Sequence, residues 1–89
     1  MRYEFIPTGV CSRKIIADVD GEGIIRGVTF EAGCNGNGIG VGRLVQGRSA
    51  DEIIALLRGV QCGQKGTSCP DQLAKMLEGI QAGRIKGQE

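Results

Sequence analysis

Four cysteines and no histidine are the residues of this 89-residue chain best suited to soft-metal binding or redox chemistry. They are Cys11, Cys34, Cys62 and Cys69, in the order C-x22-C-x27-C-x6-C. Each stands among glycine, serine, asparagine or proline residues, which are typical of joints between helices and strands. A cysteine that only fills apolar space usually lies inside a strand or helix, so this placement favours sulfur chemistry.

The spacing lacks the C-x2-C pair that makes a zinc assignment specific, so the fold itself would have to gather the ligands. We expect the loop before the second strand, the joint after the third strand and the start of the last helix to share one end of the sheet. That arrangement would bring Cys11, Cys34 and Cys69 together, and Cys62 would complete a tetrahedral sulfur site. Such a site suits zinc or an iron–sulfur cluster better than a hard cation.

Two other interpretations stay open. Cys62 and Cys69 lie on a glycine-rich loop and could form a redox dithiol that closes a disulfide and passes electrons to a partner. Cys69 begins a predicted helix, where free N–H groups favour the thiolate, although Asp71 in the same turn adds negative charge. In the third interpretation the cysteines only pack, and the chain is a metal-free protein-interaction module.

The N-terminal third predicts a three-stranded antiparallel meander. Residues 3–6, 13–19 and 24–31 are rich in β-branched residues, and the turn residues of 20–23 separate the last two strands. We expect helices to follow and to cover the apolar face of this sheet, which gives an α+β fold with a single domain over residues 1–89.

About three helices are expected after Cys34. Ile39, Leu44 and Val45 fit a short helix that its glycines weaken, and Ser49 with Glu52 forms a capping box that opens a second helix. For the last helix the sequence predicts Cys69 as the N-cap, Pro70 at the first position and Gly83 at the end. The run Gly36-x-Gly38-x-Gly40 lacks the spacing of a dinucleotide-binding loop, so no nucleotide site is predicted.

Charge and hydropathy exclude several partners. Eleven basic and ten acidic side chains give a net charge of +1 without a run of one sign, which argues against nucleic acid and anionic membranes. No stretch approaches about 18 apolar residues, and the first residues have no apolar signal segment. We expect a cytoplasmic protein, whose reduced thiols favour metal ligation or redox chemistry over structural disulfides.

The string Thr67-Ser68-Cys69-Pro70-Asp71, with the residues around Cys34 and Cys62, resembles the TSCPD domain family, which is named for it. The resemblance covers nearly the whole chain. Such domains form the C-terminal part of adenosylcobalamin-dependent ribonucleotide reductases and also occur alone, so it implies an accessory module in DNA precursor synthesis with a reductase or a thioredoxin-like protein as partner. The 89 residues leave no room for the reductase barrel, nucleotide pocket and cobalamin site, so we assign no catalytic residue.

The element order is also similar to that of U-type iron–sulfur scaffolds. Their three cysteines precede a strand, follow a strand and open the last helix, as Cys11, Cys34 and Cys69 do. Where those scaffolds carry Asp and His beside the first and third cysteines, this chain has Arg13 and Ser68. With Cys62 as a fourth ligand, the similarity implies a stable metal site rather than transient cluster assembly.

Overall fold

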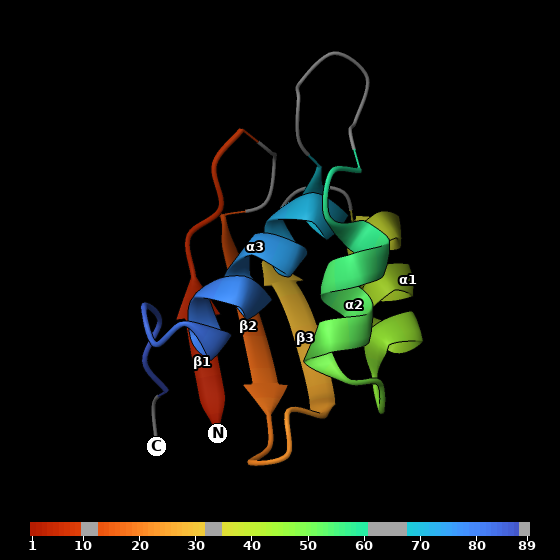
Figure 1. The fold of residues 1–89 in the computed structure, drawn as a ribbon. Coiled ribbons are helices and arrows are strands. Elements are labelled where there is room, and N and C mark those ends of the chain that lie inside the picture. The colour runs from red at the N-terminus through yellow and green to blue at the C-terminus, as the bar shows by residue number, and fades with distance from the viewer. Residues whose placement is uncertain (10–12, 32–34, 61–67, 88–89) are drawn as a thin grey trace.

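A computed structural model describes residues 1–9, 13–31, 35–60 and 68–87 (Figure 1). Three strands come first, β1 (Arg2–Phe5), β2 (Lys14–Val19) and β3 (Ile25–Glu31). Three helices follow, α1 (Asn35–Val45), α2 (Ala50–Leu57) and α3 (Cys69–Gln81). The predicted α+β order of a sheet followed by helices is confirmed.

The sheet is the predicted meander, with strand order β1-β2-β3 and antiparallel pairing throughout. Along β2, Ile15, Ala17 and Val19 are buried, while the residues between them are partly or fully exposed. This period of two gives the sheet one apolar face and one face in contact with solvent. The pairing of β2 with β3 is irregular between Asp18 and Val19, because Asp18 lies opposite Gly27 and Val19 opposite Ile25.

Side-chain hydrogen bonds close the turn between β2 and β3. Asp20 Oδ1 accepts from the backbone N–H groups of Glu22 and Ile24, at 2.9 and 3.0 Å. Its other oxygen accepts from Arg26 Nε at 2.9 Å. Gly23 has a φ of 80°, a conformation that glycine adopts without strain. The turn residues that the sequence indicates therefore set the register of the hairpin.

Helix α2 begins where the capping box predicts, and the Glu52 carboxylate forms an ion pair with Arg48 at 3.0 Å. Ser49 is the N-cap, and its hydroxyl accepts from the Glu52 N–H at 3.2 Å. Helix α3 differs from the prediction by one residue, because Ser68 rather than Cys69 is the N-cap and its hydroxyl accepts from the Asp71 N–H. A serine hydroxyl accepts this bond better than a thiol, which is a weak acceptor. Gly83 follows the end of α3 with a φ of 78°, as predicted.

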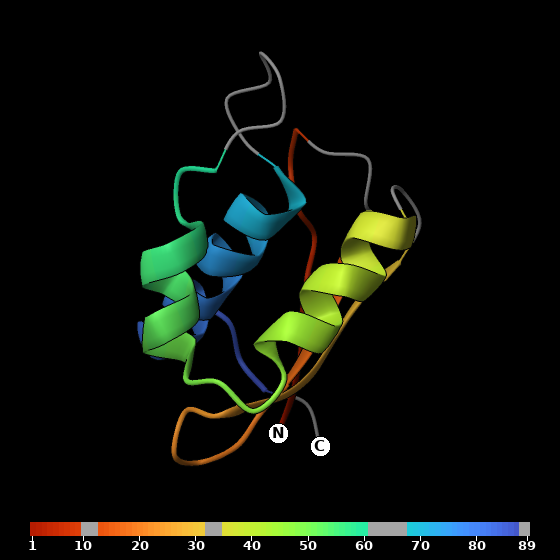
Figure 2. The ribbon, with the colours of Figure 1, turned by 90° about the vertical axis from the view of Figure 1, so that its right-hand side faces the viewer.

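Helix α3 lies over the apolar face of the sheet, α2 packs against α3, and α1 packs along β3 (Figures 1 and 2). The close approach of α1 requires Gly42, since a Cβ atom there would lie 2.7 Å from the Val28 carbonyl oxygen. One core joins all the layers, formed by Ile15, Ala17, Val19, Ile25, Val45, Ala50, Ile53, Leu73, Met76 and Leu77. In the described part of the chain, no helix is long and apolar enough to cross a membrane.

Candidate functional site

The predicted sulfur site falls largely outside the described residues. Cys11, Cys34 and Cys62 lie in segments 10–12, 32–34 and 61–67, and Cys69 is described only as the first residue of α3. Within the described ranges, no three or more Cys, Asp or Glu side chains are grouped so that they could hold a metal ion. Convergence of the four sulfurs therefore stays a prediction. The structure describes the residues that flank the cysteines in sequence, and their contacts follow.

Those flanking residues lie at one end of the molecule. β1, β3 and α2 end there, and β2, α1 and α3 begin there, while the turn between β2 and β3 and the N-terminus lie at the opposite end (Figure 1). The expectation that the joints before β2, after β3 and before α3 share one end of the sheet therefore agrees with the arrangement of the described elements.

Ser68 bonds to two different parts of the chain. Its hydroxyl accepts from the Asp71 N–H at 3.1 Å and donates to the carbonyl oxygen of Val60 at 2.6 Å. The residue is only 5 % exposed, so its hydroxyl is satisfied by protein groups. One side chain thus caps α3 and holds the segment after α2 against the start of that helix.

Asp71 adds a second connection between the same segments. It is 2 % exposed, and its Oδ1 atom accepts from the Gly59 N–H at 2.7 Å. Its Oδ2 atom lies 3.3 Å from Lys75 Nζ, one turn further along α3. A carboxylate removed from water in this way needs such donors and an opposite charge to offset its lost hydration.

Gln72 connects α3 to the loop that precedes β2. Its Oε1 atom accepts from the Thr8 N–H at 3.1 Å, and the residue is 3 % exposed. We call Ser68, Asp71 and Gln72, with their bonds to Val60, Gly59 and Thr8, the α3 clamp. Across the sheet, the Arg13 N–H donates to the Glu31 carbonyl oxygen at 2.8 Å, which joins the start of β2 to the end of β3.

The positioning role of this clamp is absent from the sequence-based interpretation, which treated Asp71 only as a charge beside Cys69. Polar residues usually occupy exposed positions, and nothing in composition or periodicity distinguishes a buried carboxylate from a solvated one. The available signal was local, because a serine three residues before Asp71 is an N-cap pattern that competes with Cys69 for that role.

The chain was compared with known proteins, solved structures and protein families. Searches of curated proteins and of solved structures found no match to the chain. The family model of the TSCPD domain matches residues 1–81, which include all six strands and helices and all four cysteines. Domains of this family are associated with ribonucleotide reductases, as the C-terminal part of those enzymes or as separate modules. The chain therefore belongs to the TSCPD domain family.

Proposed function

We propose that this chain is an accessory module of ribonucleotide reduction that binds zinc or an iron–sulfur cluster. The ligands are Cys11, Cys34, Cys62 and Cys69, at the end of the molecule where α1 and α3 begin. The observation that carries the proposal is the set of hydrogen bonds that joins the described residues on either side of these cysteines.

Each cysteine is only a few residues from a fixed neighbour. Cys11 is two residues from Arg13, Cys34 three from Glu31, Cys62 two from Val60, and Cys69 is next to Ser68. Because an extended chain spans at most about 3.6 Å per residue, no cysteine Cα can be more than about 7 to 11 Å from its neighbour. Hydrogen bonds join these neighbours in pairs, Arg13 with Glu31 and Val60 with Ser68. A further bond, from Thr8 to Gln72, joins the loop before β2 to α3.

The chemistry of the ligands supports a soft metal. The chain has no histidine, so four thiolates are the natural complete set for zinc or an iron–sulfur cluster. Cys69 is the first residue of α3, where free N–H groups and the helix dipole favour the thiolate over the thiol. When bound, the metal would supply a cross-link between segments that are distant in sequence.

Metal analysis of protein purified without oxygen tests the proposal. We expect one zinc ion per chain in a colourless sample, or iron with sulfide and visible absorption bands. Single Cys→Ser variants should each lower metal affinity, whereas Ser12→Ala, which removes a hydroxyl beside Cys11, should not. Folded protein that contains no metal and takes up neither zinc nor iron would refute the proposal.

One observation also favours a redox dithiol as a second function. The bonds from Ser68 to Val60 and from Asp71 to Gly59 hold together the ends of the segment that contains Cys62 and leads to Cys69. In that case both thiols lose their protons and form one S–S bond, and their two electrons reduce a disulfide of the reductase to two thiols. A thioredoxin-like protein would then reduce the Cys62–Cys69 disulfide back to two thiols and become oxidised itself.

Mass mapping of thiols after oxidation and after thioredoxin treatment distinguishes the two functions. The dithiol predicts a reversible Cys62–Cys69 disulfide in metal-free protein and a Cys62→Ser variant that cannot form it. Two thiols that stay independent under every redox condition would exclude electron transfer and leave metal binding intact.

A further inference from the structure

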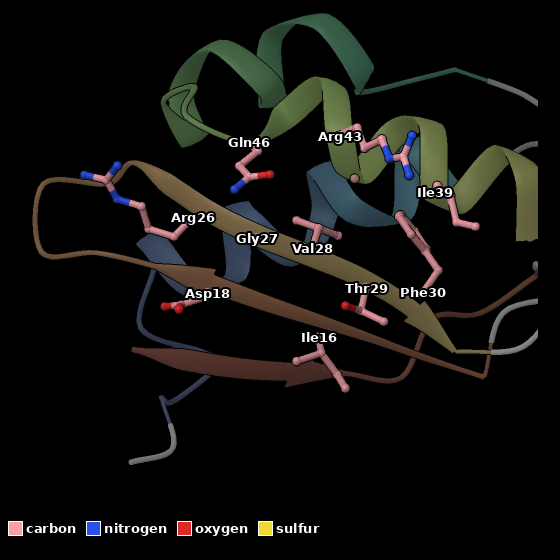
Figure 3. A pocket seen from close by; sticks show the side chains of 11 residues that line it. Ile16, Asp18, Arg26, Gly27, Val28, Thr29, Phe30, Ile39, Arg43 and Gln46 are labelled. Atoms are coloured by element: carbon pink, nitrogen blue, oxygen red, sulfur yellow. The ribbon is translucent and has the colours of Figure 1, made fainter.

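A second candidate site is a crease on the solvent-exposed side of the sheet, lined by residues of β2, β3 and α1 and by Gln46 (Figure 3). Its volume is about 550 Å³, within the range of about 300 to 1,000 Å³ that small-molecule sites occupy. Apolar side chains line part of it, including Ile39 and Phe30, and polar ones line the rest, including Thr29, Arg43 and Gln46. This combination of an apolar surface with a few polar groups is typical of a ligand site.

Among the described residues that line the crease, one arginine has no ion pair. Arg26 lies at one end of the crease, Ile39 and Phe30 lie at the other, and Gln46 and Arg43 lie between them (Figure 3). Arg26 forms an ion pair with Asp20 at 2.8 Å, and Asp18 forms one with the N-terminal amine at 3.2 Å. Arg43 has no ion pair among the described residues, so its guanidinium is free to bind a carboxylate or phosphate through two parallel hydrogen bonds.

Gly27 is an independent sign of a ligand. Glycine inside a strand lowers stability and often marks a place where a ligand comes close to the backbone. Neither packing nor backbone conformation explains this one, because a Cβ atom at Gly27 would meet nothing within 4 Å and its φ is not left-handed. The irregular pairing between β2 and β3 at Asp18 and Val19 does not require a glycine at position 27 either. A β-bulge favours glycine only where the bulged residue has a left-handed backbone conformation. The space above Gly27 is thus left open at a cost to the strand.

The geometry points to this crease as a binding site for a small organic anion. The anionic group binds Arg43, an apolar or aromatic body lies against Ile39 and Phe30, and the amide of Gln46 and hydroxyl of Thr29 are available to polar substituents. The anion is a carboxylate or a phosphate ester, because both match the guanidinium. The site does not depend on the cysteines, so it stands or falls separately from the proposed metal centre.

Titrations of 15N-labelled protein with phenyl phosphate, benzoate and uncharged benzyl alcohol, followed by NMR, test the site. We expect shifts confined to β3 and α1 for at least one of the anions and weaker binding of benzyl alcohol. Tighter binding of phenyl phosphate identifies a phosphate ester as the ligand class, and tighter binding of benzoate identifies a carboxylate. Arg43→Gln should weaken anion binding by about tenfold, while Arg84→Gln, an exposed arginine after α3, should leave it unchanged.

Gly27→Val gives a second readout that a structural role would not produce. Valine fits a strand better than glycine and would fill the crease, so the variant should lose anion binding while its melting temperature stays the same or rises. If that variant does not fold, the comparison of anion binding by Arg43→Gln and by Arg84→Gln still tests the site. Three results would overturn the proposal. They are NMR shifts spread over all the arginines, anion binding no tighter than that of benzyl alcohol, and anion binding unaffected by Arg43→Gln.

Discussion

At the scale of single residues, the polar side chains of this protein act mainly by fixing loops. Asp20 closes the hairpin between β2 and β3, and Asp71 holds the end of α2 against the start of α3. Both carboxylates accept backbone N–H bonds that an uncharged side chain would accept more weakly. The two side chains lie in different environments, since Asp71 is buried and Asp20 is in contact with solvent.

Asp20 should make the stability of the hairpin depend on pH. The N–H of Ile24 has the largest effect and lowers the pKa of Asp20 below its usual 3.8; desolvation opposes it, and the N–H of Glu22 and the Arg26 guanidinium lower the pKa further. The folded state therefore favours the carboxylate, and this contribution is complete above the usual pKa and is lost as the pH falls through the lowered one.

Urea unfolding of wild type and Asp20→Asn at a series of acidic and neutral pH values measures this effect. We expect Asp20→Asn to be less stable than wild type at neutral pH and to lose less further stability on acidification, because its side chain does not titrate. Glu22→Gln removes an exposed carboxylate of the same turn and should retain the wild-type acid profile. Parallel profiles for wild type and Asp20→Asn would contradict the assignment.

The α3 clamp predicts a larger effect at Asp71. Asp71→Ala removes the acceptor of the Gly59 N–H and the partner of Lys75, and should lower the free energy of unfolding by about 1 to 3 kcal/mol. Asp51→Ala is the matched control, since Asp51 also lies in the first turn of a helix but is exposed. It accepts one solvent-exposed bond from Gln81, so its loss should cost less, about 1 kcal/mol or below. Equal losses in urea unfolding would mean that the buried carboxylate does not stabilise this end of the molecule.

At the scale of elements, two glycines of α1 should respond in opposite ways to alanine. A Cβ atom at Gly42 would lie 2.7 Å from the Val28 carbonyl oxygen, which is fixed in β3 and cannot move aside cheaply. A Cβ atom at Gly40 would meet nothing within 4 Å. Thermal unfolding should show Gly40→Ala stabilised by about 0.5 to 1 kcal/mol from helix propensity. Gly42→Ala should be destabilised in spite of the same gain, and stabilisation of both would show that α1 does not pack closely on β3.

These elements also show where sequence patterns suffice and where they fail. The β-branched residues of 13–19, the turn at 20–23 and the Ser49 cap are local signals, and the structure confirms the strand, the turn and the cap. Cys69 was wrongly predicted as the N-cap, because Pro70 alone locates the start of a helix only to within one residue. Ser68 takes the N-cap position instead, since its hydroxyl is a stronger hydrogen-bond acceptor than the Cys69 thiol. The crease beside Gly27 depends on the packing of α1 against β3, which no local pattern specifies.

At the scale of the whole molecule, the protein has a small core and few large side chains to fill it. Only three residues of 89 are Phe or Tyr, there is no Trp, and sixteen glycines raise the entropy lost on folding. Chains of this size gain much from a cross-link or a bound metal. A metal bound by segments before β2, before α1 and before α3 would join all the layers at the end of the molecule opposite the N-terminus.

If the four cysteines bind zinc in the folded state, stability must rise with free zinc. Binding to the folded state adds about 2.7 kcal/mol at a free concentration one hundred times the Kd, provided the unfolded chain does not bind. The melting temperature of metal-free, reduced protein should therefore increase with buffered free zinc and return to its starting value when a chelator is added. The Cys34→Ser variant, one ligand short, should need more zinc for the same increase, and Ser12→Ala should follow wild type. A melting temperature independent of zinc would show that the sulfurs do not act together, and then the clamp on α3 would serve only to fix loops.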